Sequence, residues 1–202
     1  VNAKEEVSVA ATKSYILSLI NIIKLVAITS NNKIILKHLE KLPKYLDREK
    51  DNEWNPEIID KNISKGFIIS RGLGYALSTE ISLKFKELSL ELIEPFSSAE
   101  VMHGPKTLID DSLKLFVLNL NDASGKNVKE GTKLFKQISD KIYFINSFEK
   151  DRNNFHFNST KIVEIDSILL MSKFYPMIIK YSMLKGINPD KPRYLSKITK
   201  TL

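Results

Sequence analysis

The feature that most constrains the fold is a repeated alternation of short apolar runs with amphipathic segments, which begins at residue 66. The first unit consists of the apolar run "GFIIS" at 66–70, the glycine loop "RGLG" at 71–74 and the helical pattern "YALSTEISLKFKELSLEL" at 75–92. A strand, a tight glycine loop and a helix in this order form the opening unit of a doubly wound sheet. The pattern therefore predicts a parallel strand followed by the helix that covers it.

The alternation continues as far as residue 184. We expect further strands at 113–120, 141–147 and 160–166, and further helices at 124–140 and 167–184. Parallel strands that are joined by helices are covered on both faces. The sequence therefore predicts an α/β fold with three layers (αβα) built around a parallel sheet.

The N-terminal residues carry helical patterns but no strand. Helices are predicted at 8–30, at 32–50 with a break or kink at Pro43, and at 55–64, where a capping asparagine precedes a first-turn proline. Helices without a sheet of their own are typical of the closing segment of a preceding domain. We therefore expect the chain to be the C-terminal part of a larger protein.

Three parts of the chain follow from these patterns. Residues 1–65 are predicted to be the helical end of a preceding domain with a linker, and residues 66–187 to form the α/β domain. Residues 188–202 contain prolines that interrupt a long helix, so we expect this tail to wrap over the surface.

Composition excludes several classes of function. The chain has no cysteine, which excludes disulfides, thiolate zinc sites and cysteine nucleophiles and fits a cytoplasmic protein. The three histidines are too dispersed for a metal site. The longest apolar run, 16–28, is interrupted by Ser18, Asn21 and Lys24, which indicates a buried helix and not a membrane span.

The net charge of +7 is spread over lysines that alternate with acidic residues. A nucleic-acid-binding protein usually shows a clustered basic stripe and a recognisable module, and neither is present. A mild positive field can instead attract an anionic metabolite such as a sugar phosphate.

Two short stretches carry candidate chemistry. The loop at 71–74 lies between a predicted strand and helix, where backbone amides can bind an anion, although a plain tight turn explains it equally well. Lys84 and Glu87 are three positions apart and so share one face of the predicted helix. They are either a solvated ion pair or part of a site.

A third candidate is His103, which follows a capping box. Ser97 and Glu100 have the spacing of that box, so His103 is predicted to end a helix of about two turns before Gly104-Pro105 terminates it. A histidine titrates near neutral pH and is favoured at a helix C-terminus. Two interpretations are compatible with this pattern: His103 only terminates the helix, or the turn positions its imidazole for catalysis.

Four motifs in order carry a resemblance to a known family. They are "EEVSVAATKSY" at 5–15, "RGLGYALSTEISLKFKELS" at 71–89, "EPFSSAEVMHGP" at 94–105 and "NPDKPRYLSKITKTL" at 188–202. Together they resemble the sugar isomerase (SIS) domain family. They are most similar to the isomerase half of glutamine–fructose-6-phosphate aminotransferases and to glucosamine-6-phosphate deaminases with two SIS domains.

The resemblance implies a fold and an assembly. Such proteins carry two flavodoxin-like SIS domains in tandem, so residues 1–65 would end the first domain and residues 66–187 would form the second. They are usually homodimers that bind a hexose 6-phosphate between subunits, with the C-terminal tail entering the site. The family needs no metal and no organic cofactor, because the carbonyl group of the substrate supplies the acidity.

The resemblance also implies a function. The leading interpretation is a cytoplasmic enzyme that interconverts glucosamine 6-phosphate with fructose 6-phosphate and ammonia. Two alternatives stay open: the isomerase domain of a glutamine-dependent glucosamine-6-phosphate synthase, and a sugar-phosphate-binding SIS fragment without turnover. Binding of nucleic acid or of a membrane is not expected.

Four residues are similar to catalytic residues of the family. Glu87 matches the glutamate that moves a proton between C1 and C2 of the open-chain sugar, and Lys84 matches a lysine that lines that site. His103 matches the histidine that assists ring opening from the other subunit, and Lys197 matches the C-terminal lysine that reaches the pocket. A carboxylate of moderate pKa and an imidazole suit these proton transfers.

Three further residues match substrate-binding positions. Val9 and Ala11 fall where the family touches the sugar, largely through backbone, and Glu6 matches a nearby glutamate. Ala11 stands where synthases commonly carry serine, which favours the deaminases. The principal phosphate-binding residues of the family lie in the first SIS domain, which leaves open whether this chain turns over substrate on its own.

Overall fold

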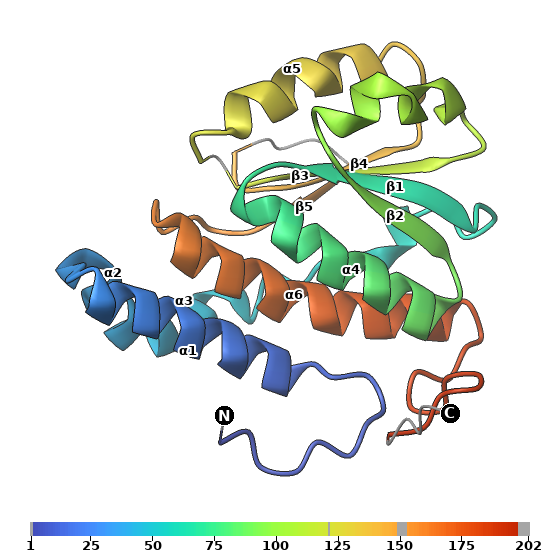
Figure 1. Cartoon of the computed structure of the whole chain (residues 1–202). Coiled ribbons are helices and arrows are strands. Elements are labelled where there is room, and N and C mark those ends of the chain that lie inside the picture. Colours follow the sequence, from blue (N-terminus) through green and yellow to red (C-terminus); the bar gives the residue numbers. More distant parts are fainter. Residues whose placement is uncertain (1, 121, 149–152, 198–202) are drawn as a thin grey trace, which may run out of the picture.

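The computed structural model describes residues 2–120, 122–148 and 153–197 (Figure 1). Its strands form one sheet in the order β2-β1-β3-β4-β5, and all neighbouring strands are parallel. The strand bounds are β1 Lys65–Ser70, β2 Leu92–Ser97, β3 Lys114–Asn119, β4 Ile142–Asn146 and β5 Asn154–His156. This order is that of flavodoxin-like doubly wound sheets.

Helices cover both faces of the sheet. The α-helices are α1 Lys13–Thr29, α2 Lys33–Glu40, α3 Leu42–Glu49, α4 Leu73–Ser89, α5 Gly125–Phe135 and α6 Val163–Leu184, and the single 3₁₀ turns are η1 Pro56–Ile58, η2 Glu100–His103 and η3 Pro105–Leu108. Helices α4 and α6 lie on one face with α1–α3 outside them, and α5 lies with η2 and η3 on the other (Figure 1). The predicted three-layer α/β fold with a parallel sheet is confirmed.

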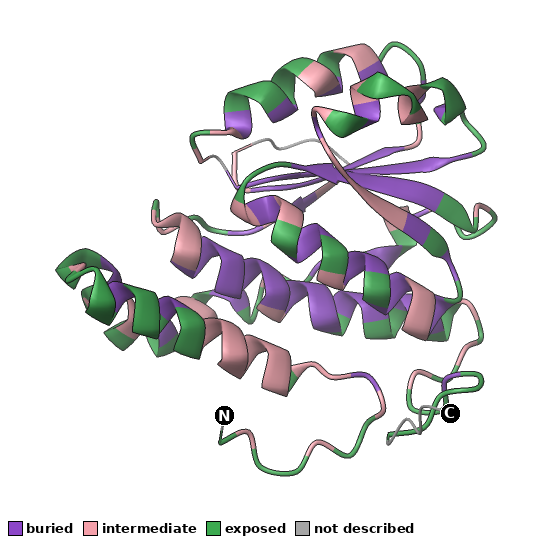
Figure 2. Ribbon diagram, in the orientation of Figure 1, coloured by how far each residue is buried: buried purple, intermediate pink, exposed green. Residues whose placement is uncertain are grey.

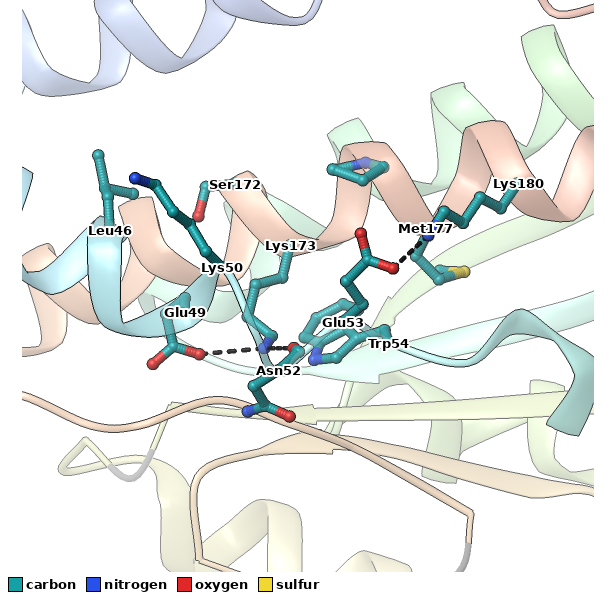
Figure 3. Close-up of a pocket in the computed structure, with 11 residues that line it drawn as sticks. Leu46, Glu49, Lys50, Asn52, Glu53, Trp54, Ser172, Lys173, Met177 and Lys180 are labelled. Carbon is teal, nitrogen blue, oxygen red and sulfur yellow. Dashed lines mark hydrogen bonds and ion pairs between the residues drawn. The ribbon is translucent and has the colours of Figure 1, made fainter.

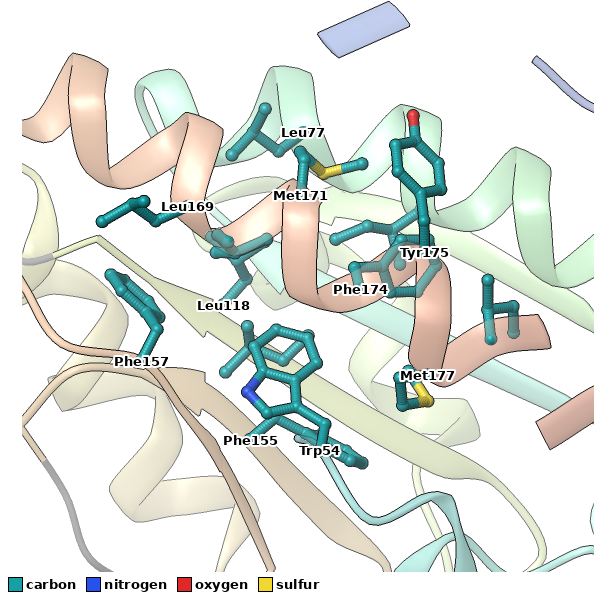
Figure 4. Close-up of a cluster of buried hydrophobic side chains, with 14 of the residues drawn as sticks. Trp54, Leu77, Leu118, Phe155, Phe157, Leu169, Met171, Phe174, Tyr175 and Met177 are labelled. Atoms are coloured by element: carbon teal, nitrogen blue, oxygen red, sulfur yellow. The ribbon is translucent and has the colours of Figure 1, made fainter. Parts of the chain in front are cut away.

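The larger hydrophobic core lies between the sheet and the α4–α6 layer. The Phe85 side chain is fully buried there, with its ring centroid 5.0 Å from that of Phe116 and 6.0 Å from that of Phe174. Trp54, which follows α3, extends this core beneath α6 (Figure 4). Helix α6 is buried along most of its length (Figure 2). This packing explains why α6 is apolar nearly all round.

The smaller core lies on the opposite face. Strand β1 alternates between the two layers, because Ile68 points into the larger core whereas Phe67 and Ile69 point into the smaller one. Val101 of η2 and Val128 of α5 close this second layer. The central strands β1, β3 and β4 are buried on both faces, as parallel strands between helices are.

The glycines of the 71–74 loop have separate structural reasons. Gly72 has φ 59°, in the left-handed region that favours glycine. A Cβ on Gly74 would lie 2.3 Å from Ser70 Oγ and 2.7 Å from Leu118 Cδ2, so only glycine lets α4 start this close to the sheet. The Asp122 carboxylate also lies against Gly72, which favours a plain tight turn over an anion site.

One predicted strand was wrong. Residues 160–166 form no strand, and α6 already begins at Val163. The Asp166 carboxylate accepts hydrogen bonds from the Thr160 backbone N–H and from its hydroxyl, both at 2.7 Å, and these fold the chain into the helix start. The last strand is instead the short β5, which the sequence patterns did not predict.

Other boundaries also differ from the prediction. The helix predicted to reach residue 92 ends at Ser89, because Leu90 takes a left-handed conformation with φ 56° and the chain then enters β2. The helix predicted from residue 8 begins at Lys13. The helix predicted at 55–64 is only the turn η1, whereas the break predicted at Pro43 is confirmed by the separate helices α2 and α3. Among the described residues, no helix has the length and apolar character needed to cross a membrane.

Candidate functional site

The predicted pair of Lys84 and Glu87 is formed on α4. The Lys84 ammonium lies 2.7 Å from Glu87 Oε2 and 3.4 Å from Glu80 Oε1. The Lys84 side chain is only 3% exposed, whereas Glu87 is 22% exposed. A buried lysine thus holds two carboxylates on one face of the helix, and one of them stays accessible to a ligand.

Glu80 is a site residue that sequence reasoning missed. The Tyr175 hydroxyl of α6 donates to Glu80 Oε1 at 2.8 Å, and Figure 4 shows this hydroxyl pointing out of the core. Burial raises the pKa of Glu80, although Lys84 and Tyr175 oppose the shift. The spacing of residues 80, 84 and 87 on one helical face was the available signal.

Tyr15 links this cluster to the N-terminal segment. Its ring meets the Tyr175 ring edge-on, with centroids 6.3 Å apart. Burial and the nearby Glu80 carboxylate raise the pKa of Tyr15 to about 12, so its hydroxyl stays protonated at neutral pH. Tyr15 and Glu80 also line a hollow of about 480 Å³ between the start of α1, α4 and β2.

Glu6, predicted to bind substrate, caps α1 in this structure. Its Oε1 accepts hydrogen bonds from the backbone N–H groups of Thr12 and Lys13, each at 2.9 Å, and its other oxygen accepts from the Ser14 hydroxyl. Burial acts to raise the pKa of Glu6, but these hydrogen bonds outweigh it and lower the pKa to about 2. The carboxylate supplies the cap that Thr12, the residue before the helix, does not.

The C-terminal tail lies against the N-terminal segment (Figure 1). Lys197 Nζ donates to the Ser8 carbonyl at 2.6 Å, and the Ser8 hydroxyl donates to Asp190 Oδ1 at 2.9 Å. The predicted residues Val9 and Ala11 follow directly and are half-buried. The structure therefore brings Lys197 beside the segment that carries Val9 and Ala11.

His103 lies on the opposite face of the sheet from Lys84 and Glu87. The capping box is formed, because the Ser97 hydroxyl accepts from the Glu100 N–H and the Glu100 carboxylate accepts from the Ser97 N–H, both at 3.1 Å. The helix is a single 3₁₀ turn, shorter than predicted, and His103 is exposed at its end. Because η2 and α4 cover opposite faces of the sheet, His103 and Glu87 do not meet within one chain (Figure 1).

A second hollow, of about 380 Å³, lies between α3 and α6 beside Trp54 (Figure 3). Its charged groups all have partners: Lys173 Nζ lies 3.0 Å from Glu49 Oε2, Lys180 pairs with Glu53, and Lys50 pairs with Asp47 beside the hollow. A wall whose charges are already paired offers little to an ionic ligand. The hollow beside Glu80 also carries a charge pair, Lys86 and Glu94 at 3.0 Å, but through Glu80 it adjoins the ionic cluster of Lys84 and is therefore the candidate site.

The chain is similar in sequence to several curated proteins, although no family model matches it. It is 30% identical over 216 residues to the glutamine–fructose-6-phosphate aminotransferase of Buchnera aphidicola, covering 97% of this chain and 34% of that protein. It is 28% identical over 211 residues to the protein of the same name from Methanothermobacter thermautotrophicus, covering 96% and 34%. The chain thus spans about a third of the length of the curated relatives it matches.

Solved structures share its fold. A Silicibacter pomeroyi protein assigned as a phosphosugar isomerase superimposes with a TM-score of 0.77 at 26% identity, covering 93% of this chain and 58% of that one. Together, the fold and the sequence relatives confirm the resemblance to the sugar isomerase domain family.

The two subfamilies indicated by the motifs both occur among the matches. The curated relatives carry the aminotransferase name. The glucosamine-6-phosphate deaminase of Thermotoga maritima superimposes with a TM-score of 0.69 at 21% identity, covering 96% of this chain and 58% of that one.

Proposed function

We propose that the chain is the isomerase part of an enzyme that interconverts glucosamine 6-phosphate with fructose 6-phosphate and ammonia. The observation that carries the proposal is the buried Lys84 that holds Glu87 at 2.7 Å while leaving its carboxylate partly exposed. The similarity to aminotransferases and to a deaminase supports the same substrate class. The predicted cytoplasmic location stays a prediction.

The proposed chemistry needs one base that accepts and returns a proton. Glu87 removes the proton from C2 of the open-chain 2-amino aldose while the C1 carbonyl oxygen takes up a proton from water, which gives an enaminol. Glu87 then returns its proton to C1 while the amino nitrogen loses one to water, which leaves an imine at C2. Water adds to that imine, and ammonia leaves to give the ketose. Lys84 holds the Glu87 carboxylate in place between transfers. Lys197, Val9, Ala11 and Glu6 are proposed to line the sugar site from the tail and the N-terminal segment.

Ammonia release from glucosamine 6-phosphate by the full-length natural polypeptide tests this function. We expect turnover in the wild type, and a loss of at least about a hundredfold in Glu87→Gln, because general base catalysis contributes that much. Glu130→Gln, which neutralises an exposed carboxylate on α5, serves as the control and should retain full turnover. Unchanged turnover in Glu87→Gln would show that the base assignment is wrong.

The glutamine-dependent synthase is the second candidate. The names of the curated relatives favour it, because they are aminotransferases. Formation of glucosamine 6-phosphate that requires glutamine, with no ammonia release in the reverse direction, would assign this reaction. Thermal stabilisation by fructose 6-phosphate without turnover would instead indicate a sugar-phosphate-binding protein.

The proposed site would be shared between two copies of the chain. We propose that His103 enters the site of a second protomer to assist ring opening, because it lies across the sheet from Glu87. A hollow of about 870 Å³ runs beside it along the edge strand β2, where Leu92 is 59% exposed and Leu108 is 63% exposed. Exposed leucines beside an edge strand are typical of an interface.

Subunit complementation tests this arrangement. In a twofold dimer that is dissociated and reassembled from equal amounts of Glu87→Gln and His103→Asn, about a quarter of all sites regain both groups. Each variant alone should be nearly inactive, and the mixture should recover about that fraction of wild-type turnover. No recovery in a confirmed mixed dimer would show that the two groups serve the same protomer or that one of them is not needed.

The division of the chain also stays a proposal. Residues 1–65 would close a first SIS domain, residues 66–187 form the second, and residues 188–202 are the tail, of which 198–202 lie outside the described residues. The outer face of α1 supports this, because Ile22, Leu25, Val26 and Ile28 are each at least 55% exposed. A preceding domain would cover that face. The mass of the natural polypeptide tests the division.

A further inference from the structure

A group of buried ionic side chains lies where α4 passes into β2. The Lys114 ammonium lies 2.8 Å from both carboxylate oxygens of Glu91, and both side chains are fully buried. The Tyr181 hydroxyl donates to Glu91 Oε1 at 2.7 Å. Such a group is costly to bury unless every member is paired, and here each one is.

Lys185, which is more exposed than Lys114, also contacts the Glu91 carboxylate. Its Nζ lies 2.6 Å from Glu91 Oε1 and donates to the Ser89 carbonyl at 3.0 Å. Lys185 is the C-cap residue of α6, whereas Ser89 and Glu91 flank the end of α4. One flexible side chain therefore joins the ends of the two helices at a buried anion.

The exit of the chain from α6 is fixed at the same point. The Gly186 N–H donates to the Met183 carbonyl and the Ile187 N–H donates to the Ser182 carbonyl, both at 2.9 Å, with Gly186 at φ 73°. These two bonds with a left-handed glycine form a Schellman motif, which reverses the chain after a helix. The direction in which the tail leaves α6 is therefore set by these backbone hydrogen bonds.

A second contact holds the tail further along. The Asp190 N–H donates to Asn188 Oδ1 at 3.0 Å, which forms a local turn, and Asp190 Oδ1 accepts from the Ser8 hydroxyl at 2.9 Å. Seven positions later, Lys197 donates to the carbonyl of the same Ser8. The stretch from Lys185 to Lys197 is thus tied to the body at each end.

We propose that the Lys185–Glu91 and Asp190–Ser8 contacts are two anchors that position the C-terminal tail, and with it Lys197, over the segment that carries Val9. Lys185 and Asp190 are positioning residues, because each acts on the site through the tail. The effect on turnover rests on the function proposed above, whereas the effect on the tail does not.

The buried group itself supplies a matched control. Glu91 has two cationic partners, so removing either ammonium leaves one cation to balance the carboxylate. Lys114→Met and Lys185→Met thus make equivalent changes in charge. Only Lys185 is covalently next to the tail, so only its loss should release the tail.

Hydrogen exchange of the backbone amides in residues 186–197 tests the anchors without substrate. In the full-length polypeptide, we expect Lys185→Met and Asp190→Ala each to speed exchange in this tail by about tenfold, which corresponds to about 1.4 kcal/mol, because alanine removes the oxygen that accepts from Ser8. Lys114→Met should leave tail exchange unchanged, and Lys185→Arg should restore protection, because arginine keeps the charge. Equal exchange in Lys185→Met and Lys114→Met, or no change in Asp190→Ala, would overturn the proposal.

Kinetics separate positioning from mere destabilisation. If a released tail must dock again when substrate binds, part of the binding free energy is used for docking. The apparent affinity for the sugar phosphate then falls in proportion to the fraction of molecules whose tail is already docked. KM therefore rises in Lys185→Met, whereas kcat stays the same. Loss of folded enzyme would instead lower kcat and leave KM unchanged, and that pattern would count against the anchors. If wild-type polypeptide turns over no sugar phosphate while tail exchange rises as expected, the anchors stand and the proposed function fails.

Discussion

Neutralising Glu6 should weaken the start of α1 in a pH-dependent way. Glu6→Gln keeps an acceptor oxygen but removes the charge that binds the N–H groups of Thr12 and Lys13 and the Ser14 hydroxyl. The gap between the ordinary pKa of 4.5 and a pKa of about 2 corresponds to roughly 3 kcal/mol of free energy. Glu6 is partly exposed, so screening reduces this to about 1–2 kcal/mol, the usual range for a helix cap.

The sign of the pH dependence follows from the lowered pKa. A carboxylate whose pKa is depressed in the folded state stabilises the fold above its unfolded pKa, and this contribution is lost as pH falls through the folded pKa. The free energy of unfolding of Glu6→Gln should therefore lie about 1–2 kcal/mol below that of wild type at pH 7. The difference should shrink as pH falls from about 5 toward 2.

Urea denaturation monitored by circular dichroism at several pH values measures this difference. Glu5→Gln removes the same charge one position earlier. Position 5 contacts α1 through its backbone carbonyl, which accepts from Lys13 Nζ, and the substitution keeps that contact, so it should change stability by less than about 0.5 kcal/mol. A difference for Glu6→Gln that stays constant with pH, or that equals that of Glu5→Gln, would refute the capping role.

Three further outcomes are expected. Lys173→Met leaves the buried Glu49 carboxylate without its cation and should cost about 3–5 kcal/mol in urea denaturation, whereas Lys180→Met, at a surface pair, should cost less than about 1 kcal/mol; equal losses would contradict this reasoning. Phe85→Ala opens a cavity among three aromatic rings and should cost about 3–5 kcal/mol in thermal or urea unfolding, and a loss below about 1 kcal/mol would show that the core collapses around it. Tyr175→Phe removes a hydrogen bond that favours the Glu80 carboxylate, so the pKa of Glu80, followed by NMR titration, should rise further; a fall would show that Tyr175 stabilises the neutral form.

The sequence predicted the central strands because burial on both faces requires continuous apolar runs. β1, β3 and β4 are such runs, and each was located within one residue at its N-terminal end. Strand β2 lies at the sheet edge and contains Glu94 and Pro95, so it lacks that signal. The error at 160–166 arose because the β-branched residues of this segment suggest a strand. In the structure, the Asp166 carboxylate accepts a hydrogen bond from the Thr160 N–H, which stabilises the start of a helix.

The candidate site was predictable only where its residues are near in sequence. Helical spacing placed Lys84 and Glu87 on one face, and the structure confirms that they pair. Tyr175 lies 95 positions from Glu80, so no local pattern could link them. From the sequence, Lys114 would be expected to be an ordinary surface lysine at the start of a strand. Only the packing shows that it is buried against Glu91.

The contact between Ser8 and Lys197 joins residues that are 189 positions apart. Closing so long a loop has a high entropic cost unless the intervening chain is already compact, so this contact can form only after the sheet and its helices are in place. The tail would thus dock on the N-terminal segment after the sheet and its helices have formed. Among the described residues, the joining of the two terminal segments would then be the last folding event.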